Sequence, residues 1–132
     1  MPLDELFDAA ARARANAHAP YSKFRVGAAV RAASGRIYAG CNVENAAYPA
    51  TLCAESGAIS AMIAGGDTRI AEVCVVGGGA ALVTPCGACR QRIREFAAAD
   101  AVIHVAGPEG VRARFTLDEL LPHAFGPDNL AP

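Results

Sequence analysis

Residues 84–90 read TPCGACR, and the fold and chemistry of the chain are best worked out from this stretch. It follows an apolar strand expected at 70–76 and begins a helix that we expect to reach about residue 98. Thr84 is the expected N-cap and Pro85 the first helical residue, positions that these residue types favour. The face of this helix expected to point toward the sheet carries Cys86, Cys89, Ile93 and Phe96.

The rest of the chain alternates helices with apolar strands. We expect helices from residue 3 to before Pro20, at 53–64 and at 117–121, and further strands at 25–33, 36–43, 101–106 and 111–115. The apolar face of the second helix is expected to carry Ala58, Ile59, Met62 and Ile63. This order predicts one α/β domain spanning residues 1–132, with a mixed five-stranded sheet and helices on its faces.

Composition limits the classes of function. The 132 residues are 53% apolar and 19% charged with a net charge of −1, which is typical of a globular chain and gives no basic excess for nucleic acid. The first residues resemble no signal peptide, and no apolar run is long enough to cross a membrane. We therefore expect a cytoplasmic protein that acts on a small molecule and whose five cysteines are not paired as disulfides.

The two cysteines of the first stretch allow two kinds of chemistry. Cys86 and Cys89 lie in the first turn of the expected helix, where free backbone N–H groups and the helix dipole stabilise thiolates. That environment suits a redox dithiol and a zinc site equally well. The Cys-x-x-Cys motif alone leaves both open.

A third cysteine favours the metal. Cys53 begins its own expected helix, and Glu55 lies two residues further on. Three thiolates with one open position form the pattern of a catalytic zinc site, and a nearby carboxylate can then move protons. We interpret Cys41 and Cys74 as structural residues. We expect none of His18, His104 and His123 to be a ligand, because two lie in polar terminal segments and one lies within an apolar strand.

Four motifs together give a resemblance to a known family. Cys53-Ala54-Glu55 and Pro85-Cys86-Gly87-Ala88-Cys89 match the zinc-deaminase signature in its three-cysteine form. With YSKFRVGAA (21–29), GCNVENAAY (40–48) and CRQ (89–91), the chain resembles the small, homotetrameric cytidine deaminases from about Leu6 to Phe125. The resemblance implies their three-layer α/β fold.

The resemblance also implies an activity. Cys53, Cys86 and Cys89 would hold one Zn²⁺ per subunit, and the zinc-activated water would attack C4 of the cytosine ring. Glu55 would take the proton from that water, protonate N3 and pass a proton to the leaving ammonia. The products would be uridine or deoxyuridine, as in pyrimidine salvage.

The substrate contacts are inferred in the same way. The resemblance implies nucleoside contacts at Phe24, Asn42, Val43, Glu44, Tyr48, Ala54 and Phe125. Asn42 and Glu44 alternate at a strand end, so both are expected to face the same way, and an amide beside a carboxylate suits the hydroxyls of a sugar. The resemblance implies that they bind the ribose 3′-hydroxyl. Tyr48 and Phe125 would reach the site of a neighbouring subunit in a homotetramer.

One position departs from the family pattern. Many relatives carry an arginine directly after the catalytic glutamate, where this chain has Ser56. Zinc with three thiolates has a net charge of −1, which weakens it as a Lewis acid. Our hypothesis is that Arg90 supplies the missing positive charge, whereas Ser56 could hydrogen-bond a ligand sulfur.

Three other interpretations remain open. A deaminase of nucleoside-like antibiotics such as blasticidin S shares the zinc motifs, although the NVEN residues at 42–45 favour an ordinary nucleoside. A zinc-stapled interaction module without turnover would make Glu55 dispensable. A dithiol redox protein would leave Cys53 and Glu55 unexplained.

Overall fold

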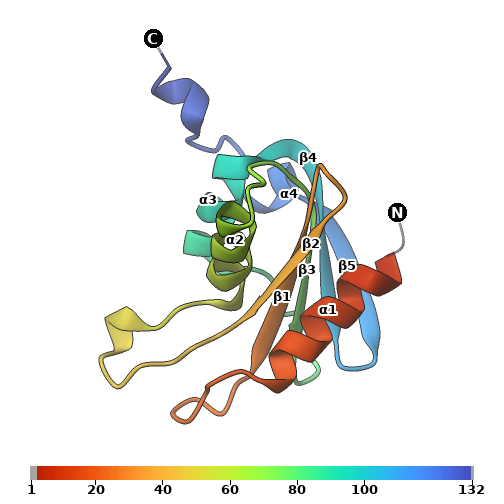
Figure 1. The fold of residues 1–132 in the computed structure, drawn as a ribbon, viewed down its shortest axis with the longest axis vertical. Helices are drawn as coiled ribbons and strands as arrows, with labels where there is room; N and C mark the ends of the chain where they lie inside the picture. The colour runs from red at the N-terminus through yellow and green to blue at the C-terminus, as the bar shows by residue number, and fades with distance from the viewer. Residues whose placement is uncertain (1–2, 132) are drawn as a thin grey trace.

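The structure, a computed structural model, describes residues 3–131, so the predicted domain limits at 1 and 132 lie outside it. One five-stranded mixed sheet has the order β2-β1-β3-β4-β5. The strands are β1 (Val26–Ala32), β2 (Ile37–Cys41), β3 (Ile70–Gly77), β4 (Ala97–Gly107) and β5 (Gly110–Thr116). The helices are α1 (Leu3–Ala15), α2 (Ala54–Ala64), α3 (Gly87–Phe96) and α4 (Leu117–Leu120), with 3₁₀ turns at Tyr48–Ala50 and Pro127–Asn129. Helices lie on both faces of the sheet (Figure 1), which confirms the predicted three-layer α/β fold.

Helix α1 covers one face of the sheet. Its buried residues Leu6 and Ala10 pack against Ala29 of β1 and against Cys74 and Val76 of β3. Alternate strand residues point to opposite faces, so their neighbours fill the core on the other side. That second core joins α2, α3 and α4 to the sheet and includes Val30, Ala58, Met62, Val73, Val75, Ile93, Ile103 and Leu117.

Gly40 allows α2 to lie directly on the sheet. A Cβ atom at this position of β2 would lie 2.4 Å from the backbone nitrogen of Ala58 and 2.7 Å from the carbonyl oxygen of Ala54. Any larger side chain would push these two backbones apart. The absence of a side chain at Gly40 therefore fixes the height of α2, and of the residues at its N-terminus, above the sheet.

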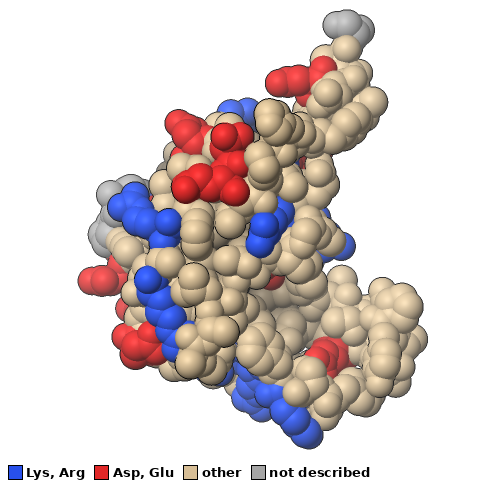
Figure 2. All heavy atoms as spheres, turned by 180° about the vertical axis from the view of Figure 1, so that it is seen from behind, with Lys and Arg blue, Asp and Glu red and all other residues tan. Residues whose placement is uncertain are grey.

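Segment 42–53 links β2 to α2 and extends away from the sheet (Figure 1). At its base, Val43 and Leu52 exchange two backbone hydrogen bonds of 2.9 Å. The backbone of His18 also bonds to Asn42 and Glu44 on the same segment. Seen from behind, the surface is hollowed between this projection and the body of the protein (Figure 2). No helix within residues 3–131 has the length and apolar character needed to span a bilayer.

Several predicted boundaries were wrong. Helix α3 begins at Gly87 with Cys86 as its N-cap, so Thr84 does not cap it. It ends at Phe96 because the following residues already belong to β4, which is longer than predicted. On α2, Ile63 is 42% exposed and does not share the buried face of Ala58, Ile59 and Met62.

Candidate active site

The sheet topology brings the N-termini of α2 and α3 together. Strand β1 pairs antiparallel with both β2 and β3, so β2 and β3 run in the same direction on either side of it. Their carboxyl ends therefore lie at the same edge of the sheet. Helix α2 follows β2 and α3 follows β3 along the chain, so both helices begin near that edge and contact each other. Free backbone N–H groups and two positive dipole ends converge there.

Three cysteines lie at this meeting point and form what we call the thiol cluster: Cys53, Cys86 and Cys89. Their sulfur atoms all lie within 4.8 Å of one another. Cys53 and Cys86 are the N-caps of α2 and α3, and Cys89 is fully buried in the first turn of α3. Cys86 is exposed, and the prediction that both thiols of α3 point inward was wrong for it because it precedes the helix.

The donor set of the thiol cluster fits zinc. Burial raises the pKa of Cys53, and burial and the neighbouring carboxyl and thiol groups raise that of Cys89. At Cys86 burial acts in the same direction, but hydrogen bonds from the backbone and side chain of Cys89 lower the pKa below its ordinary value. Ionisation of all three neighbouring thiols is therefore unfavourable unless a cation offsets their negative charge. Zn²⁺ binds thiolate sulfur and, with three protein ligands, keeps a fourth position open.

Glu55 lies in the first turn of α2, two residues after Cys53. Glu55 is only 5% exposed, and this burial raises the pKa of its carboxyl group. A hydrogen bond with Cys89 and the charge of Arg92 act in the opposite direction. A carboxyl group whose pKa is raised is a stronger base than an ordinary carboxylate, which favours its use as a proton shuttle.

The sequence around this site matches a known family. Residues 1–105 match the profile described as the cytidine and deoxycytidylate deaminase zinc-binding region. The chain belongs to this deaminase family. Within the matched region, the structure brings together the thiol groups of Cys53, Cys86 and Cys89.

Cytidine deaminases of several bacteria resemble the chain over nearly its whole length. It is 40% identical over 99% of its length to a cytidine deaminase of Sporosarcina psychrophila, covering 96% of that protein. It is 42% identical over 92% of its length to the cytidine deaminase of Mycobacterium tuberculosis, covering 87% of that protein. The crystal structure of cytidine deaminase from Burkholderia pseudomallei superposes with a TM-score of 0.87 at 39% identity, covering 95% of this chain and all of that one. The deaminase fold is thereby confirmed.

Asn42 and Glu44 both contact the segment that precedes β1. The Asn42 amide accepts a hydrogen bond from Val26 N at 2.9 Å and donates one to Phe24 O at 2.8 Å. Glu44 Oε1 accepts from the backbone N–H groups of Tyr21 and Ser22 at 3.0 and 3.1 Å, and the Ser22 hydroxyl donates to Oε2. These bonds lower the pKa of the Glu44 carboxyl group. Both side chains are held in place and keep further hydrogen-bonding capacity.

The predicted aromatic contacts lie on the surface of the single chain. Glu44 and Tyr48 line a cleft of about 420 Å³, whereas Phe125 lines a different one of about 400 Å³ beside α3. Phe24, Tyr48 and Phe125 are 43%, 72% and 57% exposed. The structure of one chain therefore does not gather them into a single pocket with the thiol cluster. Of the other predicted contacts, Ala54 is buried and Val43 is exposed.

The hypothesis that Arg90 offsets the thiolate charge does not agree with its contacts. Its guanidinium group donates to the carbonyl oxygens of Pro85 and Leu120 at 2.7 and 2.8 Å and to the Thr84 hydroxyl at 3.0 Å. These bonds tie the loop before α3 to α4. The arginine beside a thiol is Arg92, whose Nη1 lies 3.5 Å from Cys89 Sγ. Sequence reasoning missed Arg92, although its position three residues after Cys89 was a usable signal.

The remaining cysteines and histidines lie outside the thiol cluster. Cys74 is fully buried in β3, and burial raises its pKa to about 12, as expected for a structural thiol. His104 is buried in β4, where its Nε2 lies 2.9 Å from Glu72 Oε2. Among residues 3–131, neither contributes to the group of potential metal ligands.

Proposed function

We propose that this protein is a zinc-dependent cytidine deaminase that hydrolyses cytidine and deoxycytidine to uridine and deoxyuridine and releases ammonia. The observation that carries the proposal is the thiol cluster, three sulfur atoms within 4.8 Å at two helix N-termini, with the buried Glu55 in the first turn of α2. Family membership and the named relatives at about 40% identity support the same substrate class.

The thiol cluster would hold one Zn²⁺ per subunit, which when bound supplies the Lewis acidity that activates water for attack on C4 of the ring. Glu55 accepts the proton of that water, because its buried carboxyl group has a raised pKa. It delivers this proton to N3, then takes the remaining proton of the hydroxyl group added at C4 and passes it to the departing amino group. One water is consumed and one ammonia leaves, so Glu55 ends the cycle in its starting state.

The nucleoside is held by groups that the fold already orients. Asn42 and Glu44 would bind the ribose 3′-hydroxyl, one donating and one accepting, with the hydrogen-bonding capacity left after their contacts to residues 21–26. Phe24 would pack on the pyrimidine, and Val43 and Ala54 would line the site.

We further propose that the protein is a cytoplasmic homotetramer that acts on free nucleosides in pyrimidine salvage, with no nucleic-acid or membrane partner. Tyr48 and Phe125 would then complete the sites of neighbouring subunits, and their exposure in the single chain supports this arrangement. The net charge of −1 supports a free nucleoside over a polymer. Light scattering of the purified protein would give the number of subunits.

The direct test is to follow the loss of cytidine absorbance and the release of ammonia by the zinc-loaded protein. Deoxycytidine and blasticidin S serve as alternative substrates, and Glu55→Ala is the matched inactive variant. The proposal expects turnover of cytidine and deoxycytidine that disappears in Glu55→Ala while zinc stays bound. Turnover of blasticidin S alone would favour the antibiotic deaminase, and stoichiometric zinc with no turnover would favour the interaction module.

A further inference from the structure

The charge of the occupied thiol cluster is unbalanced. Three thiolates carry −3 and Zn²⁺ carries +2, which leaves −1 at a site whose chemistry depends on a strong Lewis acid. This inference rests on the proposed role of Cys53, Cys86 and Cys89 as the zinc ligands. A cation that lies against one of the sulfurs would remove the imbalance.

Helix geometry places Arg92 in that position. Cys89 and Arg92 are three residues apart on α3, so their side chains lie on the same face, and long helical side chains lean back toward the N-terminus. The Arg92 guanidinium group therefore lies over the buried sulfur, with Nη1 3.5 Å from Sγ. Arg90, two residues earlier, is held by Pro85, Thr84 and Leu120 instead.

A cleft lies beside Arg92 between α2 and α3, and Ile59 and Phe96 form the apolar part of its lining. Ser56 and Ser60 of α2 line this cleft of about 470 Å³ together with Gln91, Arg92 and Glu95 of α3. Ser56 directly follows Glu55, so a guanidinium group in this cleft lies next to the turn that carries the carboxyl group. Glu95 lines the same cleft, but within residues 3–131 no ion pair joins it to Arg92. The charge of Arg92 is thus directed at the thiol cluster.

We propose that Arg92 is a positioning residue that donates a hydrogen bond to the Cys89 sulfur and offsets the surplus negative charge of the zinc–thiolate centre. It acts through the ligand and does not touch the substrate. Ser56, the small residue that directly follows Glu55, lines the same cleft as Arg92 from the opposite helix.

Cobalt substitution tests this without relying on activity. A cation beside a sulfur stabilises its donor electrons, so the sulfur-to-cobalt charge-transfer band lies at shorter wavelength. In the Co²⁺-loaded full chain, Arg92→Met is expected to move this band to longer wavelength, and Arg92→Lys, which keeps the charge, is expected to stay closer to the wild type. Arg94→Met removes the same charge from the same helix away from the sulfurs and serves as the control.

The zinc-loaded Arg92→Met variant is expected to lose about 10-fold in kcat, the lower end for residues that orient metal ligands, with KM unchanged.

An Arg92→Met band at the wild-type wavelength, or an equal shift in Arg94→Met, would overturn the assignment. Because the band is recorded without substrate, the two proposals can fail separately. A shifted band in a protein that does not deaminate cytidine would support the role of Arg92 and refute the proposed function. An unchanged band in an active deaminase would do the reverse.

Discussion

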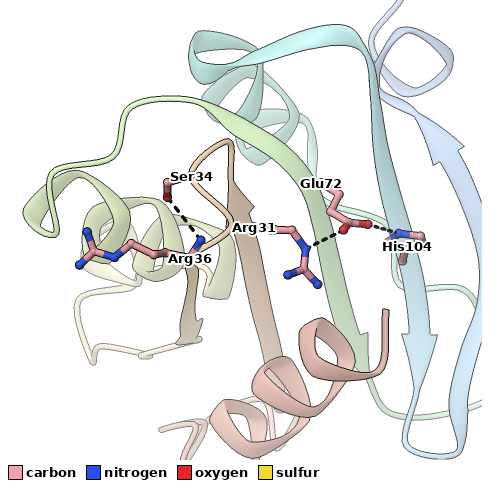
Figure 3. A network of polar contacts seen from close by, with 5 residues as sticks. All are labelled: Arg31, Ser34, Arg36, Glu72 and His104. Carbon is pink, nitrogen blue, oxygen red and sulfur yellow. Dashed lines mark hydrogen bonds and ion pairs between the residues drawn. The ribbon is translucent and has the colours of Figure 1, made fainter. Parts of the chain in front are cut away.

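Two polar clusters lie on opposite faces of the same sheet, and they differ in how their charges are matched. On the face covered by α1, Glu72 of β3 lies between Arg31 of β1 and His104 of β4 (Figure 3). Its Oε1 is 2.8 Å from Arg31 Nε and its Oε2 is 2.9 Å from His104 Nε2. The Glu72 carboxylate is thus matched on both oxygens across three adjacent strands, whereas among the described residues the buried Nδ1 of His104 has no hydrogen-bond partner. At the other site, the thiol cluster gathers three groups of the same kind.

The difference shows which buried polar groups indicate function. Buried charges are tolerated when opposite charges and hydrogen bonds match them, and the matched Glu72 carboxylate joins three strands in this way. Like groups crowded at two helix N-termini do not stabilise one another when ionised, and they need an external cation. We therefore assign structure to Arg31, Glu72 and His104 and chemistry to the thiol cluster.

The largest expected effect comes from removing the most buried member of the thiol cluster. Cys89→Ala leaves two thiol ligands, so zinc content measured by mass spectrometry is expected to fall from about one per chain to less than about a tenth. Cys74→Ala is the matched control, because this cysteine is equally buried but lies outside the cluster. Equal zinc loss in both variants would contradict the assignment of the ligands.

The second effect separates metal binding from proton transfer. Glu55→Gln keeps the size of the side chain but cannot carry the proton, so kcat is expected to fall by at least about 10²–10⁴-fold. Zinc content and the circular dichroism spectrum should remain those of the wild type. Glu109→Gln, on the exposed turn before β5, controls for the loss of one carboxyl group. A Glu55→Gln variant that retains turnover would exclude the proton-shuttle role.

The third effect concerns the paired cluster and acts on stability. Burial opposes ionisation of Glu72, but the hydrogen bonds from His104 and Arg31 outweigh it and lower its pKa. A carboxyl group whose pKa is lowered on folding stabilises the fold above its unfolded pKa, and this contribution is lost as pH falls through the folded value. Glu72→Gln is expected to cost about 1–3 kcal/mol of unfolding free energy near pH 7.

The cost of Glu72→Gln should therefore shrink as the pH of urea denaturation is lowered below the ordinary glutamate range. Zinc content of this variant should be unchanged, because no ligand is touched. A stability difference that stays constant from neutral to acidic pH would show that ionic pairing of Glu72 is not what holds the three strands.

Local patterns in the sequence predicted most of the fold. The β1–β2 hairpin was predicted to within two residues at each end, because apolar runs flank the turn at Ser34–Gly35. The α3 cap was mispredicted because Thr84 has the right chemistry for an N-cap, yet Cys86 takes that place and the Thr84 hydroxyl accepts a bond from Arg90. The Arg90 hydrogen bonds that join Thr84 and Leu120 of α4 are tertiary contacts, and no local sequence pattern contains them.

The site was predictable where spacing carries the geometry. Cys86 and Cys89 share one helical turn, and the resemblance to deaminases identified Cys53 as their partner. The spacing of Arg92 three residues after Cys89 could have identified the arginine that faces the sulfurs, but the contacts that hold Arg90 away from them, with Pro85, Thr84 and Leu120, arise only in the three-dimensional structure. The surface exposure of Tyr48 and Phe125 also follows from the three-dimensional structure alone.

The most direct test of the central claim is to titrate zinc into the metal-free wild-type protein and to follow cytidine turnover at each addition. The account predicts that activity rises linearly and stops rising at about one zinc per chain, the capacity of a single three-thiolate site. Turnover that is already complete without zinc, or that needs several zinc ions per chain, would contradict the claim that the thiol cluster is the catalytic metal site.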